Sequence, residues 1–581
     1  MFTAKPKQAK PAKAAKITKS KSGRKKERWL VTAALPYVNN FPHIGVIVGS
    51  HLPADIFARF LRLFGEDVVF VGGTDEHGSP TEVAAYQQKL TPKEFCDKFY
   101  VIHNAIYKWL GISYDNFSRT SNPVNHEMTR KIFLKIYKKG LISRKKLLLP
   151  YCPQDKRFLP DRWVEGKCPY CGRIARGDQC AEGCTKLLEP SELVEPYCVI
   201  CRSKPEFREM EHLFLELPKL SDKIKNWIVS NKHWKDNVRN LALGWIKEGL
   251  KSRCITRDLQ WGVKVPLKGF EDKVFYVWID APIGYISATI EWAEQNKKPD
   301  EWKKYWCDKS SKIIHFIGKD NIPFHTIIWP ALLMGDGDFN LPYQIGGYEF
   351  LNYEGNKISK SKNWGIFLET TSDGKVKVRV RDQYIDVEPD LLRYYLSEIL
   401  PENKDSDFVW SEFENKVNGE LVGNLGNFIY RVLSFTKNNF DGVVPKPGKL
   451  GKEEKEIEKK IGEVKDVVKQ YVYELKIRDA QKKIFELSKI GNQYFQNKQP
   501  WETLKSNPDE CRTAIYTSIN LVKSLAILSE PFLPFSAEKI WKQLNLEGSV
   551  HEQKFDDLDK STIKAEHKIG EIKPLFKKFE K

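Results

Sequence analysis

The chain has 581 residues, of which 41% are hydrophobic and 29% are charged, so it is long enough for several domains with separate cores. No run of about 18 apolar residues occurs, so the sequence predicts no membrane span, and the long apolar segment of a secretory signal is also missing. The net charge of +19 favours a negatively charged partner such as nucleic acid.

About half of that positive charge lies in the amino-terminal tail. Residues 1–28 hold eleven Lys and Arg residues and one acidic residue, Glu27. A segment with so few apolar residues cannot bury a core, so residues 1–27 are predicted to be disordered. Attraction to nucleic-acid phosphates is the favoured role, and a solvated tail without a role or a targeting signal are the alternatives.

The first patterned stretch predicts a strand–helix–strand unit. An apolar run at Trp29–Leu35 is followed by a helix that begins near His43, and a second apolar run follows at Val68–Val71. In such a unit ligands bind outside the carboxyl ends of the strands. Residues 35–45 and 74–78 are therefore expected to face one pocket.

The turn into that helix is a candidate phosphate site. Free backbone N–H groups and the helix dipole favour anions there. The imidazole of His43 can donate to a phosphate oxygen, and Gly45 lets a nucleotide approach the backbone. A structural histidine is the alternative.

A second candidate lies about 300 residues later, where Lys and Ser alternate in a Gly- and Asn-rich loop. Lys357, Ser359 and Lys360 offer point charges and hydroxyl groups that suit a polyphosphate. We call residues 357–361 the KISKS loop. A solvated basic loop is the alternative interpretation.

Seven of the eleven cysteines lie between Cys152 and Cys201, which argues for metal binding rather than a disulfide framework. Two close pairs of thiolates can surround Zn²⁺ tetrahedrally. This inner set consists of Cys168, Cys171, Cys180 and Cys184. An outer set could form a second site, which the sequence leaves open, because one ligand is a carboxylate: Cys152, Asp155, Cys198 and Cys201.

Two further strands are predicted after the cysteine-rich segment. Val274–Ile279 reads as a strand that leads into a turn and a helix, and Lys312–Ile317 reads as another strand. Gly318 at its tip permits close approach of a nucleotide, and Asp320 can accept ribose hydroxyl groups. Beyond residue 411 the pattern is almost entirely that of amphipathic helices, which predicts a helix bundle.

The motifs around His43 and in the KISKS loop together resemble the HIGH and KMSKS signatures of class I aminoacyl-tRNA synthetases. Over about residues 28–545 the chain looks like a methionyl-tRNA synthetase of the eukaryotic and archaeal type. The blocks that carry this resemblance are residues 34–37, 73–78, 274–285, 318–325 and 424–428. The insertion is too short for the editing domain of the relatives for Leu, Ile and Val.

The resemblance implies an α/β, Rossmann-like catalytic domain that is split by a zinc-knuckle insertion and followed by an all-α anticodon-binding bundle. The expected domains follow in chain order. They are a basic tail (1–27), the first catalytic half (28–140), the insertion (141–250), the second catalytic half (251–345), the KMSKS and stem-contact region (346–410), the anticodon-binding bundle (411–550) and a charged extension (551–581).

The resemblance also implies the reaction and its participants. Methionine and ATP with Mg²⁺ would form methionyl-adenylate and pyrophosphate, and the methionyl group would pass to tRNA(Met). The implied methionine pocket is Leu35, Tyr37, Asp75, Trp278, Pro282, Tyr285 and His325. The implied ATP and catalytic residues are His43, Gly45, Gly318, Asp320, Lys357, Ser359 and Lys360, and the anticodon residues are Asn424, Arg431 and Trp501. A cytoplasmic monomer with structural zinc is expected.

One position departs from the family pattern. Val46 stands where the HIGH motif usually ends in His or Asn, and valine cannot donate a hydrogen bond. We expect that role to be missing or to be taken over by a neighbouring group. An adenylyltransferase without a tRNA substrate and a catalytically silent RNA-binding relative are the alternative functions.

Overall fold

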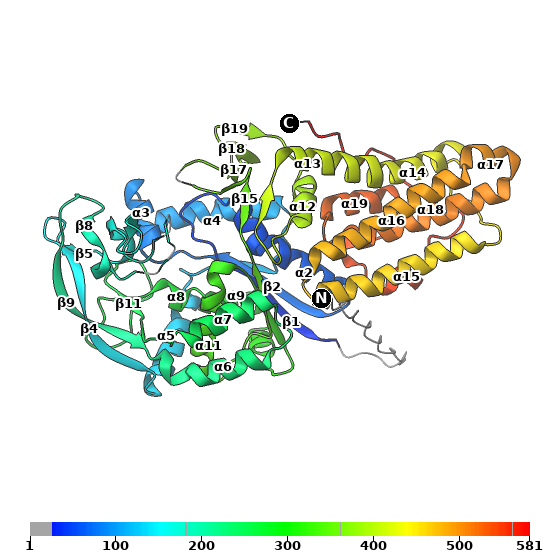
Figure 1. The fold of residues 1–581 in the computed structure, drawn as a ribbon. Helices are drawn as coiled ribbons and strands as arrows, with labels where there is room; N and C mark the ends of the chain where they lie inside the picture. Colours follow the sequence, from blue (N-terminus) through cyan, green and yellow to red (C-terminus); the bar gives the residue numbers. More distant parts are fainter. Residues whose placement is uncertain are drawn as a thin grey trace, which may run out of the picture.

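The computed structural model describes residues 26–180, 183–184, 186, 188–360, 362–560 and 562–580. The predicted basic tail lies outside the described residues, except for Lys26 and Glu27. The molecule is elongated, with the cysteine-rich insertion at one end, a helix bundle at the other and a parallel sheet between them (Figure 1).

The central sheet has five parallel strands, and it confirms the predicted Rossmann-like fold. Its first strand pairs on both sides, since Trp29 lies opposite Lys312 on one neighbour and Val68 on the other. Strands that are buried on both faces read as continuous apolar runs, which is how they were recognised in the sequence. The strand order is β14 (Gln344–Tyr348), β13 (Lys312–Gly318), β1 (Arg28–Ala33), β2 (Asp67–Thr74) and β3 (Asn116–Arg119).

The helix after β1 is the core helix of the catalytic domain. It runs through α1 (Ile44–Val46), a π-helical turn η1 (Ile47–His51) and α2 (Leu52–Leu63). Among the described residues this run, Ile44–Leu63, is long and apolar enough to cross a membrane by composition, but 83% of it is buried inside the protein. Its apolar surface therefore serves the protein core.

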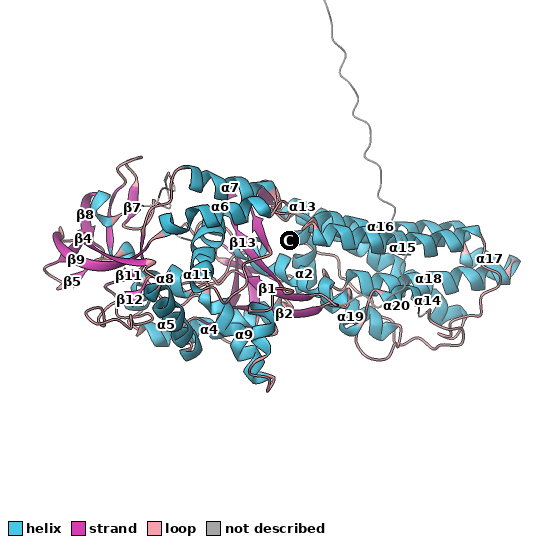
Figure 2. Cartoon of the chain, turned by 90° about the horizontal axis from the view of Figure 1, so that it is seen from below, coloured by secondary structure: helices cyan, strands magenta, loops and turns pink. Residues whose placement is uncertain are grey.

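Other helices flank the sheet and the cleft at its edge. Figure 2 shows several of them packed around the strands. They are α3 (Ser79–Gln87), α4 (Pro92–Trp109), α5 (Pro123–Lys138), α9 (Ile283–Gln295), α10 (Glu301–Trp306) and α11 (Trp329–Asp336), which follows the π-helical turn η6 (Phe324–Ile328).

The predicted strand at Val274–Ile279 is wrong. Strand β12 covers only Val274–Phe275 and pairs with β11 (Thr256–Arg257) in a separate antiparallel ribbon, and helix α8 (Val277–Asp280) follows directly. The strands of the parallel sheet are β14, β13, β1, β2 and β3, and this segment is not among them. A short buried helix and a short buried strand show the same apolar run in sequence.

The insertion is built on a long antiparallel arm of β4 (Ile142–Cys152) and β9 (Glu206–Leu215). A small sheet of β7 (Ile174–Arg176), β6 (Val164–Lys167) and β8 (Val194–Cys198) lies among the cysteines. Helices α6 (Ser221–Ser230) and α7 (Asp236–Lys247) lead the chain back to the catalytic domain.

The KISKS region consists of short strands and one helix. A hairpin of β15 (Leu351–Tyr353) and β16 (Asn356–Lys357) opens it, and β15 also pairs with β20 (Ser406–Phe408). Between them lie β17 (Ile366–Thr370), β18 (Val376–Val380), β19 (Gln383–Ile385) and α12 (Pro389–Glu398).

The carboxyl-terminal part of the chain, from Trp410 on, forms the predicted helix bundle, whose helices run side by side away from the sheet (Figure 2). Residues 562–580, which were expected to belong to a charged extension, pack back onto it. Phe579 lies edge-on to Phe413 at 4.9 Å, and its backbone exchanges two hydrogen bonds of 2.8 Å with the Asn418 side chain. The main helices are α13 (Trp410–Lys416), the π-helical η7 (Val417–Gly426), α14 (Asn427–Asn439), α15 (Lys452–Tyr473), α16 (Ile477–Lys498), α17 (Pro500–Ser506), α18 (Pro508–Ser529) and α19 (Pro534–Gln543).

A buried arginine joins this bundle to the catalytic domain. Arg393 of α12 is fully buried, and its guanidinium donates to the carboxylate of Asp55 on α2 at 2.8 Å. Three backbone carbonyls accept its other hydrogen bonds, those of Leu110, Pro531 and Phe532, at 2.8 to 3.0 Å. We call this group the Arg393 junction.

Candidate active site

A cavity of about 630 Å³ opens at the carboxyl ends of the sheet strands. Residues of the segment around His43 and of the KISKS loop both line this cavity. All but one of the residues implied for methionine and ATP also line it: Leu35, Tyr37, His43, Gly45, Asp75, Trp278, Pro282, Tyr285, Gly318, Asp320, His325, Lys357 and Lys360.

His43 occupies the residue before helix α1, as a phosphate-binding turn requires. Its Nδ1 atom is buried without a hydrogen-bond partner among the described residues. A side chain at Gly45 would meet the imidazole at 3.0 Å, so glycine keeps this space open. Burial, and then the charge of Lys360, lowers the pKa of His43 to about 3, which makes the ring neutral at physiological pH.

The KISKS loop follows a tight hairpin. Lys357 ends β16 and lines the cavity, whereas Ser359 pairs its backbone with Trp364 in an isolated bridge, at 2.8 and 3.0 Å, and does not line it. Lys360 is exposed as a residue, yet desolvation in the cleft, followed by the charge of Arg162, lowers its pKa to about 8. Ser361 lies outside the described residues.

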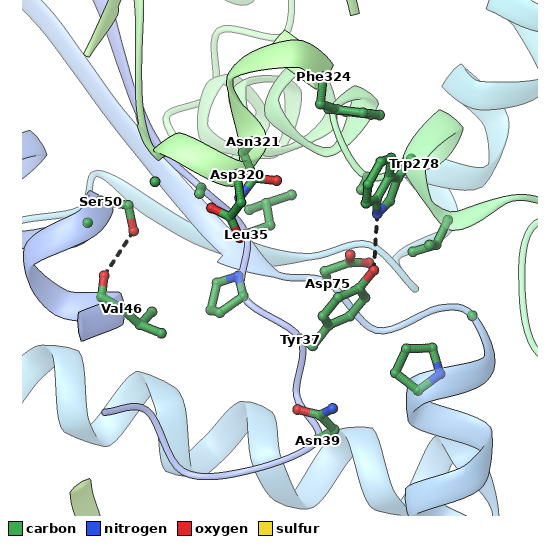
Figure 3. A pocket seen from close by; sticks show the side chains of 18 of the residues that line it. Leu35, Tyr37, Asn39, Val46, Ser50, Asp75, Trp278, Asp320, Asn321 and Phe324 are labelled. Atoms are coloured by element: carbon green, nitrogen blue, oxygen red, sulfur yellow. Dashed lines mark hydrogen bonds between the residues drawn. The ribbon is translucent and has the colours of Figure 1, made fainter. Parts of the chain in front are cut away.

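The other end of the cavity is an aromatic slot with a carboxylate at its edge (Figure 3). The Trp278 indole N–H donates to the Tyr37 hydroxyl at 3.1 Å. Tyr37 is placed beside Asp75 because the backbone N–H of Asp75 donates to the Pro36 carbonyl at 2.9 Å. Figure 3 shows Asp75 behind Tyr37 and below Trp278, so the three side chains face one space.

Two more predicted residues of the methionine pocket, Tyr285 and His325, also line the cavity. The Tyr285 hydroxyl lies 3.0 Å from Nε2 of His325, whose Nδ1 lies 3.1 Å from the Asn321 carbonyl. Burial lowers the pKa of His325 to about 4, so its ring is neutral. Contrary to the expected strand end, Trp278 lies on the short helix α8, and Pro282 precedes α9.

The Asp75 carboxylate lies in an unfavourable electrostatic environment. It is only 4% exposed, and one of its carboxylate oxygens has no hydrogen-bond partner among the described residues. Burial, and then the neighbouring carboxylates of Asp280 and Glu76, raises its pKa well above the ordinary value. A cation placed at this oxygen would relieve both the desolvation and the repulsion.

The third part of the cavity lies at the tip of β13. A side chain at Gly318 would approach the Asp320 carboxylate to 2.9 Å, so glycine leaves room there. Val46 lines the cavity opposite, and Figure 3 shows its backbone carbonyl accepting the Ser50 hydroxyl at 3.2 Å. The Val46 side chain brings no polar atom to the cleft.

Several polar residues of this cavity were not predicted from the sequence, among them Arg162 and His103. Arg162, from the insertion, lines the cavity with a buried Nε that has no hydrogen-bond partner among the described residues and lies 3.7 Å from the Asp178 carboxylate. His103, from α4, also lines it. His103 follows Phe95 and Phe99 at intervals of four residues, and an imidazole in such an apolar stripe is the signal that could have pointed to it.

Both cysteine sets are assembled as ligand clusters. The four ligand atoms of each set lie within 4.8 Å of one another. In the inner set the Sγ atoms of Cys168 and Cys184 are 3.7 Å apart, and those of Cys171 and Cys180 are 3.5 Å apart. Tetrahedral zinc with Zn–S bonds of about 2.3 Å separates its sulfurs by about 3.8 Å, so the donor set fits Zn²⁺.

In the outer set Asp155 takes the fourth position. Its Oδ2 lies 3.2 Å from the sulfur of Cys152 and 3.0 Å from that of Cys198. Cys152 and Cys201 bring their sulfurs to 3.4 Å. Three thiols and one carboxylate in this arrangement also suit a closed zinc site.

The residues implied for anticodon binding lie in the helix bundle, distant in sequence from the residues of the cleft. Arg431 is stacked over Phe495 and Trp501, at 5.1 and 5.7 Å from the ring centres. Trp501 is 39% exposed at the start of α17, so it is not a core residue. Asn424 is tied into the bundle, because it donates to Ser488 at 2.9 Å and accepts from Asn492 at 2.7 Å.

Comparisons with known proteins agree over nearly the whole chain. A family model described as tRNA synthetases class I (M) matches residues 29–433. A second model, described as the anticodon binding domain of methionyl tRNA ligase, matches residues 444–581.

Individual relatives give the same result. The methionine–tRNA ligase of Pyrococcus furiosus is 46% identical over 570 residues, which covers 95% of this chain and 75% of that protein. That of Ignicoccus hospitalis is 42% identical over 559 residues, with coverage of 95% and 96%. The solved structure of Mycobacterium tuberculosis methionyl-tRNA synthetase in complex with methionyl-adenylate has a TM-score of 0.75 and 25% identity, and covers 95% of this chain and 100% of that one.

Proposed function

This chain belongs to the class I methionyl-tRNA synthetases, and we propose that its cleft joins methionine to tRNA(Met) in two steps. In the first step a methionine carboxylate oxygen attacks the α-phosphate of ATP, which enters as its magnesium complex, and pyrophosphate leaves. In the second step a ribose hydroxyl at the tRNA 3′ end attacks the methionyl carbonyl, loses its proton, and AMP leaves. Neither step requires a protein nucleophile.

The unpartnered, buried oxygen of Asp75 carries this proposal. It lies at the edge of an aromatic slot, in the same cavity as His43 and Lys360. The substrate ammonium would pair with Asp75 and keep that carboxylate ionised. The thioether would lie against Tyr37 and Trp278, since sulfur packs well on aromatic rings.

Catalysis would come from positioning and charge stabilisation. His43 and the space above Gly45 would receive the phosphates at the helix start. Lys357 and Lys360 would neutralise the departing pyrophosphate. Gly318 and Asp320 would hold the adenosine, with the carboxylate accepting ribose hydroxyl groups.

At the other end of the molecule, Trp501 would stack on an unpaired anticodon base and Arg431 would hold that indole or contact phosphate. Asn424 would position the surrounding helices, because its amide is already bonded within the bundle.

Two structural zinc ions are the proposed metals, one in each cysteine set. Both sets have four protein ligands, so they leave no position for substrate. Gly183 supports a built inner site, since a side chain there would come within 2.5 Å of Cys180 Sγ and 2.7 Å of Cys171 Sγ. Zinc would fix the insertion that carries Arg162 to the cleft.

Metal analysis tests the zinc count. We expect two zinc ions per purified chain, one for Asp155→Ala and one for Cys171→Ser. An unchanged count in Asp155→Ala would remove that carboxylate from the ligand set.

ATP–pyrophosphate exchange with each of the twenty amino acids tests the reaction. We expect exchange with methionine without tRNA, and methionylation once tRNA(Met) is added. Exchange without any charging would favour the adenylyltransferase alternative. No exchange with any amino acid would favour the silent relative, for which Val46 is the one argument.

A further inference from the structure

His103 is a cleft residue that belongs to neither signature motif. It lies on helix α4 and is only 1% exposed, with its ring edge-on to Tyr107 at 6.0 Å. The same residue lines the cavity that holds His43 and Lys360. A buried histidine at the wall of a catalytic cavity can present one ring nitrogen to the core and the other to the cleft.

The hydrogen bonds of His103 fix which nitrogen carries the proton. Nε2 lies 3.0 Å from the Asn40 carbonyl oxygen, which can only accept. Nε2 is therefore the protonated nitrogen of the neutral ring, and Nδ1 bears a lone pair. That Nδ1 is buried and has no hydrogen-bond partner among the described residues. Buried polar atoms almost always have a hydrogen-bond partner. An acceptor without one at this position indicates a donor that reaches it during the reaction.

Lys360 lines the same cavity as His103 and carries the positive charge that bears on this ring. Burial lowers the pKa of His103 to about 4, the bond to Asn40 opposes that shift, and the charge of Lys360 adds to it. The ring is therefore neutral and able to accept a hydrogen bond at physiological pH. An ammonium has three N–H donors, so it can bind an imidazole and a phosphate at once.

We propose that His103 is a positioning residue for Lys360: its Nδ1 accepts a hydrogen bond from the lysine ammonium as the KISKS loop closes on the pyrophosphate. This inference rests on the proposed function, in which Lys360 stabilises the leaving group. Lysine has a flexible stem, and fixing its ammonium on a rigid helix removes the need to order it during the reaction. Because position 46 is a valine, His43 and His103 are the histidines that line this part of the cleft.

Two variants separate this role from a structural one. His103→Asn places an amide oxygen near the position of Nδ1 but loses the bond to Asn40, and His103→Gln keeps an N–H for Asn40 but loses the acceptor. We expect His103→Gln to lower kcat of ATP–pyrophosphate exchange about tenfold with methionine KM unchanged, and His103→Asn to stay within about threefold of wild type. The unchanged methionine KM also shows that the variants are folded.

A double-mutant cycle with Lys360→Ala tests whether His103 acts through the lysine. The effect of His103→Gln should disappear in the Lys360→Ala background, because the group to be positioned is then absent. His233→Gln is the matched control, since His233 also places Nε2 against a backbone carbonyl, that of Tyr343 at 2.8 Å, but is exposed and does not line the cavity. It should exchange at the wild-type rate.

The inference is overturned if His103→Asn is the more damaged variant, if both variants keep full activity, or if the effects of His103→Gln and Lys360→Ala multiply. Each of these results leaves the proposed function standing, because wild type would still exchange with methionine. A wild-type protein without exchange would overturn the proposed function and the inference together.

Discussion

The cleft and the Arg393 junction both contain buried polar atoms, but the two regions differ in whether those atoms have hydrogen-bond partners. At the junction Arg393 and Asp55 are fully buried, and the arginine makes four hydrogen bonds to named partners. In the cleft, Asp75, His43 and His103 each keep a buried polar atom without a partner among the described residues. Both regions lie beside the helix run Ile44–Leu63.

The difference separates structural from functional polar groups. Burial alone would raise the pKa of Asp55, but Arg59 and Arg393 outweigh it and hold that pKa below the ordinary value. For Asp75 the nearby charges are carboxylates, and they add to the effect of burial. A buried polar group with hydrogen-bond partners stabilises the fold, whereas a buried polar group without a partner indicates the position of a ligand.

Removing the arginine should cause the largest loss of stability. Arg393→Met keeps the apolar stem but removes one of the two arginines that pair with Asp55, leaving it with Arg59 and Ser113, and it deprives three backbone carbonyls of their donor. We expect a loss of about 3–5 kcal/mol in the free energy of unfolding, measured by urea titration of the helical circular dichroism signal.

The control for this prediction is Arg512→Met, which removes an arginine that pairs with Asp509 on the surface of α18. Exposed pairs of this kind contribute little, so its midpoint should match wild type. Equal stability of both variants would show that the junction does not join the bundle to the catalytic domain.

Most of the fold could be predicted from local sequence patterns. The strands at β1, β2 and β13 lie within a few residues of their predicted ranges, because each carries its own apolar run. The segment at 274–279 could not be placed this way. A short apolar run does not distinguish a strand from a buried helix, so the state of this segment depends on the packing around it.

The site was predictable where a short motif carries it, and not where packing carries it. His43, Asp75 and the KISKS loop stand in recognisable motifs and line one cavity. Arg162 and His103 reach the cavity only because the insertion and α4 pack against it, and no local pattern encodes that contact. Ser359, in contrast, belongs to the motif but does not line the cavity, and its backbone pairs with that of Trp364.

Removing the charge of the Asp75 carboxylate in the cleft should have a smaller effect in free energy than removing Arg393. Asp75→Asn keeps the size of the side chain but cannot ionise, so the substrate ammonium loses its counter-charge. We expect methionine KM in ATP–pyrophosphate exchange to rise about hundredfold, which corresponds to about 2.7 kcal/mol, with ATP KM within about twofold of wild type. Because the carboxylate is not part of the fold's hydrogen-bond network at its free oxygen, the unfolding midpoint should not fall.

The sign of the pH effect sharpens this test. Asp75 must be ionised to pair with ammonium, and its raised pKa means that the carboxylate forms only as pH increases. The methionine KM of the wild type should therefore fall as pH rises from the acidic side, and that dependence should vanish in Asp75→Asn. Asp236→Asn, which alters a side chain that is 90% exposed, should retain it. A rise in methionine and ATP KM by the same factor would contradict the role of Asp75 as the ammonium partner, and would place it instead with the residues that shape the cleft.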